Sequence, residues 1–155
     1  MTVLLFCFFL GCVAGLRSLT APAVVCWAAH LGWLHFAGTK LAFLGHPASL
    51  IIFTLLALLE LITDKLPKTP ARTAPPGLIA RIVFGGFCGV ALATSAGVSQ
   101  IASVIVGVIG ALVGTFGGYN LRHALVKRAH LPDFAVALAE DFVAIAGGLL
   151  IVSNL

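Results

Sequence analysis

Long apolar runs separated by short polar links dominate this chain of 155 residues. Six apolar segments can be marked, and they cover residues 2–16, 21–38, 48–62, 78–96, 101–119 and 134–152. A helix needs about 20 apolar residues to cross the hydrocarbon of a bilayer, with a usual range of about 17–25. The second, fourth, fifth and sixth segments have that length, whereas the first and third are short. The pattern predicts an all-α, polytopic transmembrane helix bundle with five or six spans.

Composition supports this class and excludes others. Hydrophobic residues make up 61% of the chain and charged residues 9%, against about 25% charged in an ordinary soluble domain. A soluble fold of this size could not hide so much apolar surface, and a membrane barrel would alternate apolar and polar residues. The same composition excludes a disordered chain and a secreted disulfide scaffold. The four cysteines lie inside apolar segments and suit reduced packing residues. We expect residues 1–155 to form a single transmembrane helical domain.

The first two segments are separated by a link that breaks the helical pattern between Arg17 and Pro22. Proline ends or kinks a helix, and an arginine in so short a link either reaches the interface or faces protein. Two alternatives follow. Both segments span the membrane as a tight hairpin, which is the favoured one, or they form a single broken, re-entrant element whose backbone is covered by protein or water.

Basic residues predict the orientation. Three links carry most of them: the link after the first segment has Arg17, the link after the third has Lys65, Lys68, Arg72 and Arg81, and the link after the fifth has Arg122, Lys127 and Arg128. With six spans these links share one side, and the opposite side has Lys40 and little else. Such an asymmetry marks the cytoplasmic face. We therefore expect a multi-pass protein of the bacterial inner membrane with its basic loops in the cytoplasm.

Three segments followed by three invite a search for an inverted repeat. The stretches 11–14 and 88–91 align at a shift of 77 residues, and Asp64 and Asp141 align at the same shift. These few matches make a 3+3 inverted repeat a hypothesis.

The five acidic residues point to a polar layer. Glu60 and Asp64 are four residues apart, so they share one helix face at the end of the third segment. Glu140 and Asp141 lie about 10 Å into the sixth segment, counted from its cytoplasmic start. Asp133 follows a proline before that segment and is typical of a helix N-cap.

Together with the arginines that enter from the same side, most of these acids gather in the cytoplasmic third of the membrane. Ionised groups in a bilayer cost about 2.5–3.5 kcal/mol each on insertion scales, so they pair or line a wet cavity. One interpretation is an ion-binding or solute-binding site, and the other is a set of structural salt bridges. Asp64 and Lys65 also lie where membrane-interface residues are expected. The predicted binding residues are Glu60, Asp64, Glu140, Asp141, Arg17 and Arg81.

Glycines repeat every four residues in two segments. They are Gly85 and Gly89 in the fourth segment and Gly110, Gly114 and Gly118 in the fifth. Small residues at this spacing let helix backbones approach closely in lipid. The spacing predicts tight packing within one chain or, as the alternative, the seam of a homodimer.

No nucleophile motif, phosphate loop or dinucleotide fingerprint appears in the sequence. We expect neither an enzyme nor a cofactor, and the net charge of +4 does not indicate a nucleic-acid partner. The leading hypothesis is a small transporter or channel for an ion or small polar solute, acting as a dimer among membrane lipids. The alternative is a structural or lipid-interacting membrane protein, and an intramembrane enzyme is the third.

Four short motifs are shared with a known family. They are Gly15-Leu16-Arg17-Ser18-Leu19, Glu60-Leu61-Ile62-Thr63-Asp64-Lys65-Leu66-Pro67, Pro132-Asp133-Phe134 and Leu138-Ala139-Glu140-Asp141. Over nearly its whole length the chain resembles the small bacterial membrane proteins of domain of unknown function family 4126. The resemblance implies an integral membrane protein and supplies no substrate. The positions that match the family's motif are Glu60, Asp64, Lys65, Pro67, Glu140 and Asp141.

Overall fold

A computed structural model describes residues 1–66, 71 and 73–155 of the protein. Within these residues the chain forms six α-helices, one short 3-10 helix and no strand. They are α1 Thr2–Leu16, α2 Thr20–His30, η1 Ala42–Gly45, α3 Pro47–Thr63, α4 Pro75–Ala96, α5 Gln100–Lys127 and α6 Asp133–Ser153. The prediction of an all-α bundle is confirmed. Three of these helices, α4, α5 and α6, are long and apolar enough to cross a membrane, while α1 and α3 are shorter apolar helices.

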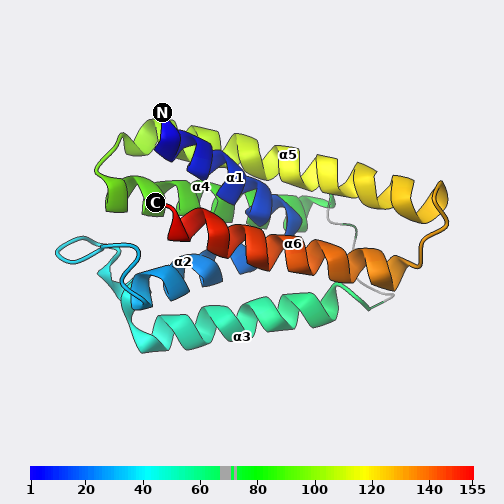
Figure 1. Ribbon diagram of the computed structural model, residues 1–155, viewed down its shortest axis with the longest axis horizontal. Helices are drawn as coiled ribbons and strands as arrows, with labels where there is room; N and C mark the ends of the chain where they lie inside the picture. The colour runs from blue at the N-terminus through cyan, green and yellow to red at the C-terminus, as the bar shows by residue number, and fades with distance from the viewer. Residues whose placement is uncertain (67–70, 72) are drawn as a thin grey trace.

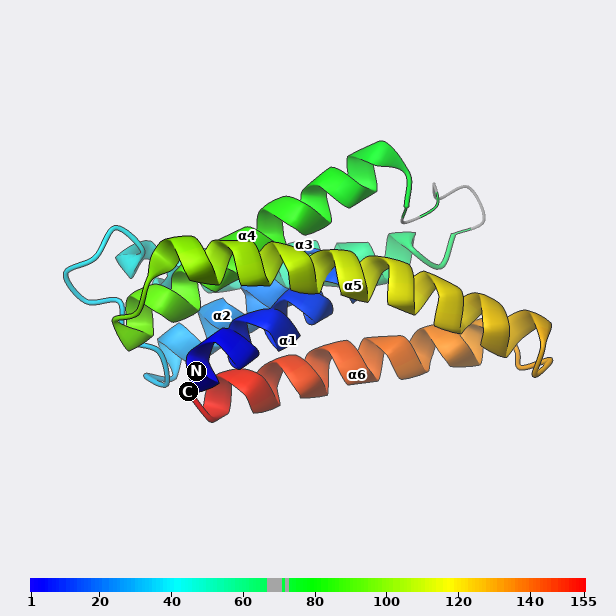
Figure 2. The same cartoon turned by 90° about the horizontal axis from the view of Figure 1, so that it is seen from above.

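The helices lie side by side along the long axis of the molecule (Figures 1 and 2). Both chain termini lie at one end, together with the link between α2 and α3. The link between α5 and α6 lies at the opposite end, as does the chain that follows α3. The helices of the first half run opposite to their counterparts in the second half, as a 3+3 inverted repeat requires. The links after α3 and α5 therefore lie at the same end of the bundle, as the charge pattern predicts, whereas the link after α1, which carries Arg17, lies inside the bundle.

Glycines join α1, α4 and α5 into the tightest part of the bundle. A Cβ atom on Gly110 would collide with the backbone carbonyl of Phe8, and one on Gly114 would collide with that of Cys12. A Cβ atom on Gly89 would likewise meet the carbonyl of Ser103. Small residues at such contacts let the helix backbones approach and gain dispersion energy that lipid does not supply. The glycines of the sequence motif thus pack within one chain, which is the first of the two predicted alternatives.

The chain reverses direction between α1 and α2. Arg17 has an extended backbone (φ −141°, ψ 108°), α2 begins at Thr20, and Pro22 lies in the first turn of α2, where its missing N–H is tolerated. The 15 residues of α1 and the 11 of α2 rise about 22 Å and 16 Å, less than the about 30 Å of bilayer hydrocarbon. The turn therefore lies beside the middle of α5, where Gly15 packs against Gly114 and Thr115.

Two expected boundaries are wrong. The second apolar segment was expected to reach residue 38, but α2 ends at His30, since Gly32 and Gly38 have positive φ values that end regular helix. The fifth segment was expected to end at Tyr119, but α5 continues to Lys127, so Arg122 lies on a helix and not in a link. Pro67, Lys68 and Arg72 lie outside the described residues.

Candidate functional site

A fully buried arginine is the centre of the candidate site. The side chain of Arg17 has 0% exposure and projects from the turn between α1 and α2. Its Nη1 atom contacts a carboxylate oxygen of Asp64, at the end of α3. Its Nη2 atom lies 2.5 Å from Oδ1 of Asp141 on α6, in ion-pair contact without hydrogen-bond geometry. One guanidinium therefore joins three elements of the bundle.

Lys65 completes this group of charges. Its Nζ atom donates a hydrogen bond to Oδ2 of Asp141 over 2.8 Å and lies 6.0 Å from the ring centroid of Phe134, within cation–π range. We call Arg17, Asp64, Lys65 and Asp141 the Arg17 cluster. It contains two cations and two carboxylates, so its formal charge is zero. The sequence placed Lys65 at the membrane interface, and its side chain, 27% exposed, is the most accessible of the cluster.

Glu60 lies one turn before Asp64 on α3 and serves a different purpose. Its carboxylate accepts hydrogen bonds from the backbone N–H of Ser18 (2.8 Å), the hydroxyl of Ser18 (2.5 Å) and the backbone N–H of Leu19 (2.8 Å). These donors lie at the start of α2, where backbone N–H groups have no partner within the helix. A negative charge there is also favoured by the helix dipole. Glu60 therefore caps α2 from a neighbouring helix.

A second group of charges joins α5 to the start of α6. Arg122 binds both carboxylate oxygens of Asp133, through Nε at 2.9 Å and Nη2 at 2.8 Å. Its Nη1 lies 3.5 Å from Oε2 of Glu140. The predicted N-cap role of Asp133 is wrong, because the N-cap of α6 is Pro132 and Asp133 is the first helical residue. Its side chain is instead held by the bidentate arginine.

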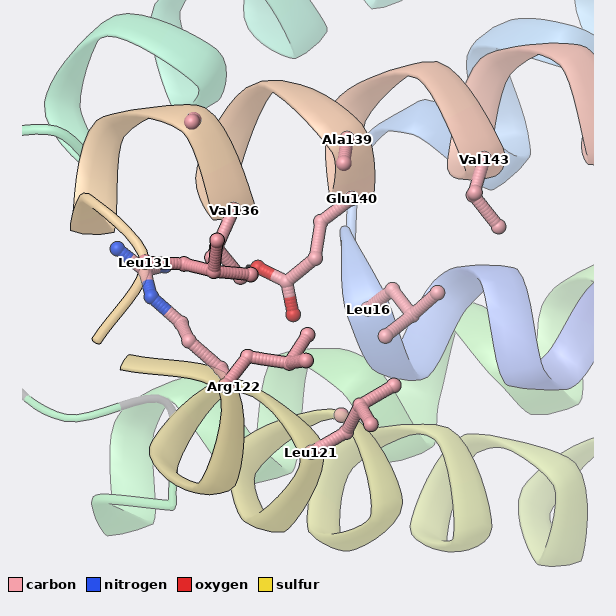
Figure 3. A pocket seen from close by; sticks show the side chains of 11 residues that line it. Leu16, Leu121, Arg122, Leu131, Val136, Ala139, Glu140 and Val143 are labelled. Atoms are coloured by element: carbon pink, nitrogen blue, oxygen red, sulfur yellow. Dashed lines mark hydrogen bonds and ion pairs between the residues drawn. The ribbon is translucent and has the colours of Figure 1, made fainter. Parts of the chain in front are cut away.

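The acids that are adjacent in sequence thus point to different partners. Successive residues of a helix are about 100° apart around its axis, so Glu140 faces α5 while Asp141 faces α1 and α3. Figure 3 shows Glu140 reaching from α6 toward Arg122 on α5. The predicted binding layer is therefore two groups, with Asp64 and Asp141 at Arg17 and Glu140 at Arg122.

A cavity of about 280 Å³ lies beside Glu140 and Arg122 (Figure 3). Its other walls are apolar and come from the end of α1, from α5 and from α6, including Leu16, Leu121 and Val143. The cavity places an apolar volume next to an ion pair. Such a site suits a small molecule with one polar end.

Arg81, the remaining predicted binding residue, is buried in α4 at 4% exposure. It lies one turn before Gly85, which packs against Gly107 and Ala111 of α5. Because α4 and α5 run antiparallel, Arg81 lies near the depth of Thr115 and hence of the Arg17 turn. Within the described residues, no group of three or more His, Cys, Asp or Glu side chains is arranged to hold a metal ion.

Sequence reasoning missed two residues as members of the charged groups: Lys65, which was expected only at the membrane interface, and Arg122. Polar residues after Tyr119 suggested that the span ended there, although apolar residues at positions 124–126 continue a helical pattern that would have kept Arg122 on the helix.

The family model described as Domain of unknown function (DUF4126) matches residues 4–154. The chain belongs to this family. Its match covers the motifs that carry Arg17, Glu60, Asp64 and Asp141, and confirms the resemblance found in the sequence. No curated protein and no solved structure matches the chain.

Proposed function

We propose that this protein is a small membrane transporter or channel for an ion or small polar solute, with the Arg17 cluster as its working site. The observation that carries the proposal is a guanidinium with 0% exposure held between carboxylates of α3 and α6. Ionisable residues inside a membrane protein are rare and costly, and they often line substrate or ion pathways.

Stability alone is a poor reason for such a cluster. Each ionised group costs about 2.5–3.5 kcal/mol on insertion scales, and replacing a buried ion pair by well-packed apolar residues is often neutral or stabilising. In lipid, the glycine contacts of α1, α4 and α5 already supply close packing. A group of four charges is therefore better accounted for by a function that uses their charge.

The arrangement provides a way to couple binding to movement. A proton or other cation that binds Asp141 neutralises this carboxylate and weakens its hold on Arg17 and Lys65. Arg17 then keeps its contact with Asp64 alone, which loosens α6 from the α1–α2 turn and from α3. Release of the cation restores the pairs. The cap from Glu60 holds the turn to α3 throughout the cycle.

The proposal includes two further features. The basic links would face the cytoplasm of a bacterium, with the protein in the inner membrane, because Lys65 after α3 and Lys127 and Arg128 at the end of α5 lie toward the same end of the bundle. The working form would be a dimer, because a bundle this small leaves little room for a solute path within one chain.

Flux measurements test the proposal. Purified protein is reconstituted in liposomes, and the uptake of protons and of monovalent cations and anions is followed with Asp64→Asn, Asp141→Asn and, as a control, Lys40→Gln at the opposite end. We expect flux of one ion that at least one of the two carboxamide variants reduces at least tenfold and the control leaves unchanged. Absence of flux for every ion would reject the class, and unchanged flux in both variants would reject the Arg17 cluster as the site.

One observation favours a second candidate, a structural or lipid-interacting protein. Every charged group of the Arg17 cluster is within contact distance of an opposite charge, which is what a lock between helices requires. This candidate predicts a lower melting temperature for the neutral variants and no flux in any of them.

A further inference from the structure

The cavity beside Glu140 lies where α1 ends. Along its length α1 packs between α5 and α6 (Figures 1 and 2), and these two helices make few direct contacts with each other. Leu16 is the last residue of α1 and lines the cavity, whereas α5 continues to Lys127. Beyond Leu16, the space between α5 and α6 is therefore left as a cavity of about 280 Å³.

Small residues keep this space open toward the membrane. Gly118 of α5 and Ala135 and Ala139 of α6 line the cavity. Leu121 and Val143 also line it and are more than half exposed, so the cavity reaches the outer surface of the bundle. Both α5 and α6 are long and apolar enough to cross a membrane. The opening between them therefore faces lipid, from which a molecule with an apolar part can enter.

One wall of the cavity is charged. Figure 3 shows Glu140 extending from α6 into the cavity, with Arg122 on one side and Leu16 on the other. The Glu140 side chain keeps 11% exposure. Arg122 binds Asp133 through Nε and Nη2, over 2.9 Å and 2.8 Å, and reaches Glu140 only through Nη1, over 3.5 Å. Two carboxylates therefore share this guanidinium, and the one on Glu140 has the longer contact.

This arrangement favours a cationic ligand over an anionic one. A carboxylate has about four lone-pair sites, so Glu140 can accept an N–H donor from a ligand while it stays paired with Arg122. An anion would instead have to compete with two carboxylates for the guanidinium and would be repelled by the charge of Glu140. The polar end of a matching ligand is therefore a protonated amine.

The size and the other walls of the cavity define the rest of the ligand. A water molecule takes up about 30 Å³ in the liquid, so the cavity has room for roughly nine groups of that size. Its remaining walls are apolar and suit a hydrocarbon group. We propose that the cavity binds a small lipophilic ammonium ion, with the amine on the Glu140 carboxylate and the hydrocarbon group against Leu16, Leu121 and Val143. Glu140 is not part of the Arg17 cluster, so the inference does not depend on transport.

Phenethylamine, an ammonium ion of about this size at neutral pH, is the probe. Binding of the tritiated amine to the detergent-solubilised protein is measured by scintillation proximity, in competition with 2-phenylethanol and phenylacetate. We expect saturable binding in the wild type, and competition by the neutral alcohol and the anion that is at least about tenfold weaker than competition by unlabelled amine, because a hydrogen bond to a charged group is stronger than a neutral one. Equal competition by 2-phenylethanol, or a lack of saturable binding, would overturn the proposal.

Substitutions test the position of the site. Glu140→Gln keeps the shape of the side chain and removes its charge, and Ala139→Trp places an indole ring in the cavity. Leu138→Trp is the matched control, because Leu138 is the preceding residue of α6, is exposed and does not line the cavity. We expect phenethylamine to bind at least about tenfold more weakly to Glu140→Gln and Ala139→Trp, and to bind Leu138→Trp as it binds the wild type. Wild-type affinity in Glu140→Gln, or equal losses in the two tryptophan variants, would overturn the proposal. If Ala139→Trp does not fold, Glu140→Gln decides.

Discussion

Arg17 shows how one residue can connect three helices. Its position is dictated by the break after α1, where an extended backbone directs the side chain inward and not along the helix surface. The guanidinium has donors on several sides, so it contacts Asp64 and Asp141 together, which a lysine amine does less well. The identity of this residue was evident in the sequence. Its second partner was not, because nothing in the local pattern separates the directions of Glu140 and Asp141.

Removing the guanidinium should be costly. Arg17→Met leaves the carboxylates of Asp64 and Asp141 close together without their shared cation, and breaking a buried ion pair costs about 3–5 kcal/mol. Thermal unfolding in detergent should show a large drop in melting temperature. Arg128→Met, at the exposed end of α5, is the control and should melt like the wild type. An equal melting temperature for Arg17→Met would contradict the structural account of the cluster.

The cap from Glu60 makes a prediction about backbone protection. Glu60→Ala removes the acceptor of the N–H groups of Ser18 and Leu19, and loss of a capping group costs about 0.5–2 kcal/mol. Hydrogen–deuterium exchange should become faster in a peptide that covers residues 17–22. Exchange at the start of α4, which Glu60 does not cap, should be unchanged. Unaltered exchange at 17–22 would show that the cap does not stabilise α2.

At the scale of the elements, the glycine spacing was the most informative pattern. The glycine spacing predicted close contacts between helices, and in the structure α5 makes these contacts with α1 and α4. The pattern could not choose between a neighbouring helix and a second chain, because both present the same surface to a glycine. The boundaries of α2 and α5 were harder to predict. A positive φ at Gly32 is not visible in hydropathy, and the polar residues after Tyr119 obscure the apolar residues at 124–126 that continue the helix.

Two glycines of α5 allow a matched test of this packing. Gly114→Ala places a methyl group against the carbonyl of Cys12, whereas Gly117→Ala meets no atom within 4 Å. Overpacking costs about 1–3 kcal/mol, so Gly114→Ala should lower the melting temperature. Gly117→Ala should be neutral or slightly stabilising, because alanine favours a helix by about 1 kcal/mol over glycine. The reverse order of the two variants would contradict the contact between α1 and α5.

At the scale of the whole molecule, composition and charge predicted most of the architecture. Rare charge indicated a membrane protein, and the grouping of cations indicated that three links share an end. The links after α3 and α5 do so, but the link that carries Arg17 is a turn inside the bundle. Sequence could not predict the apolar crevice of about 350 Å³ that α2, α3 and α6 line, because such a space depends on which helices do not pack against each other. It is a property of the assembled bundle and has no local signature.

The orientation can be checked by cysteine labelling. Lys40→Cys and Arg128→Cys lie at opposite ends of the bundle, and three of the four native cysteines are buried. A membrane-impermeant maleimide added to intact cells should label Lys40→Cys and spare Arg128→Cys and the wild type. Inverted vesicles should give the opposite result. Labelling of Arg128→Cys in intact cells would place the basic links outside the cytoplasm.

The central claim is that the Arg17 cluster works in transport. Its most direct test is the flux of the transported ion into liposomes that contain wild-type protein or Asp141→Asn, with the two proteins matched for melting temperature and for the amount inserted. Asparagine keeps the shape of the side chain and removes the charge that holds Arg17 and Lys65. The account predicts a flux reduced at least tenfold in Asp141→Asn. Flux equal to that of the wild type would contradict it.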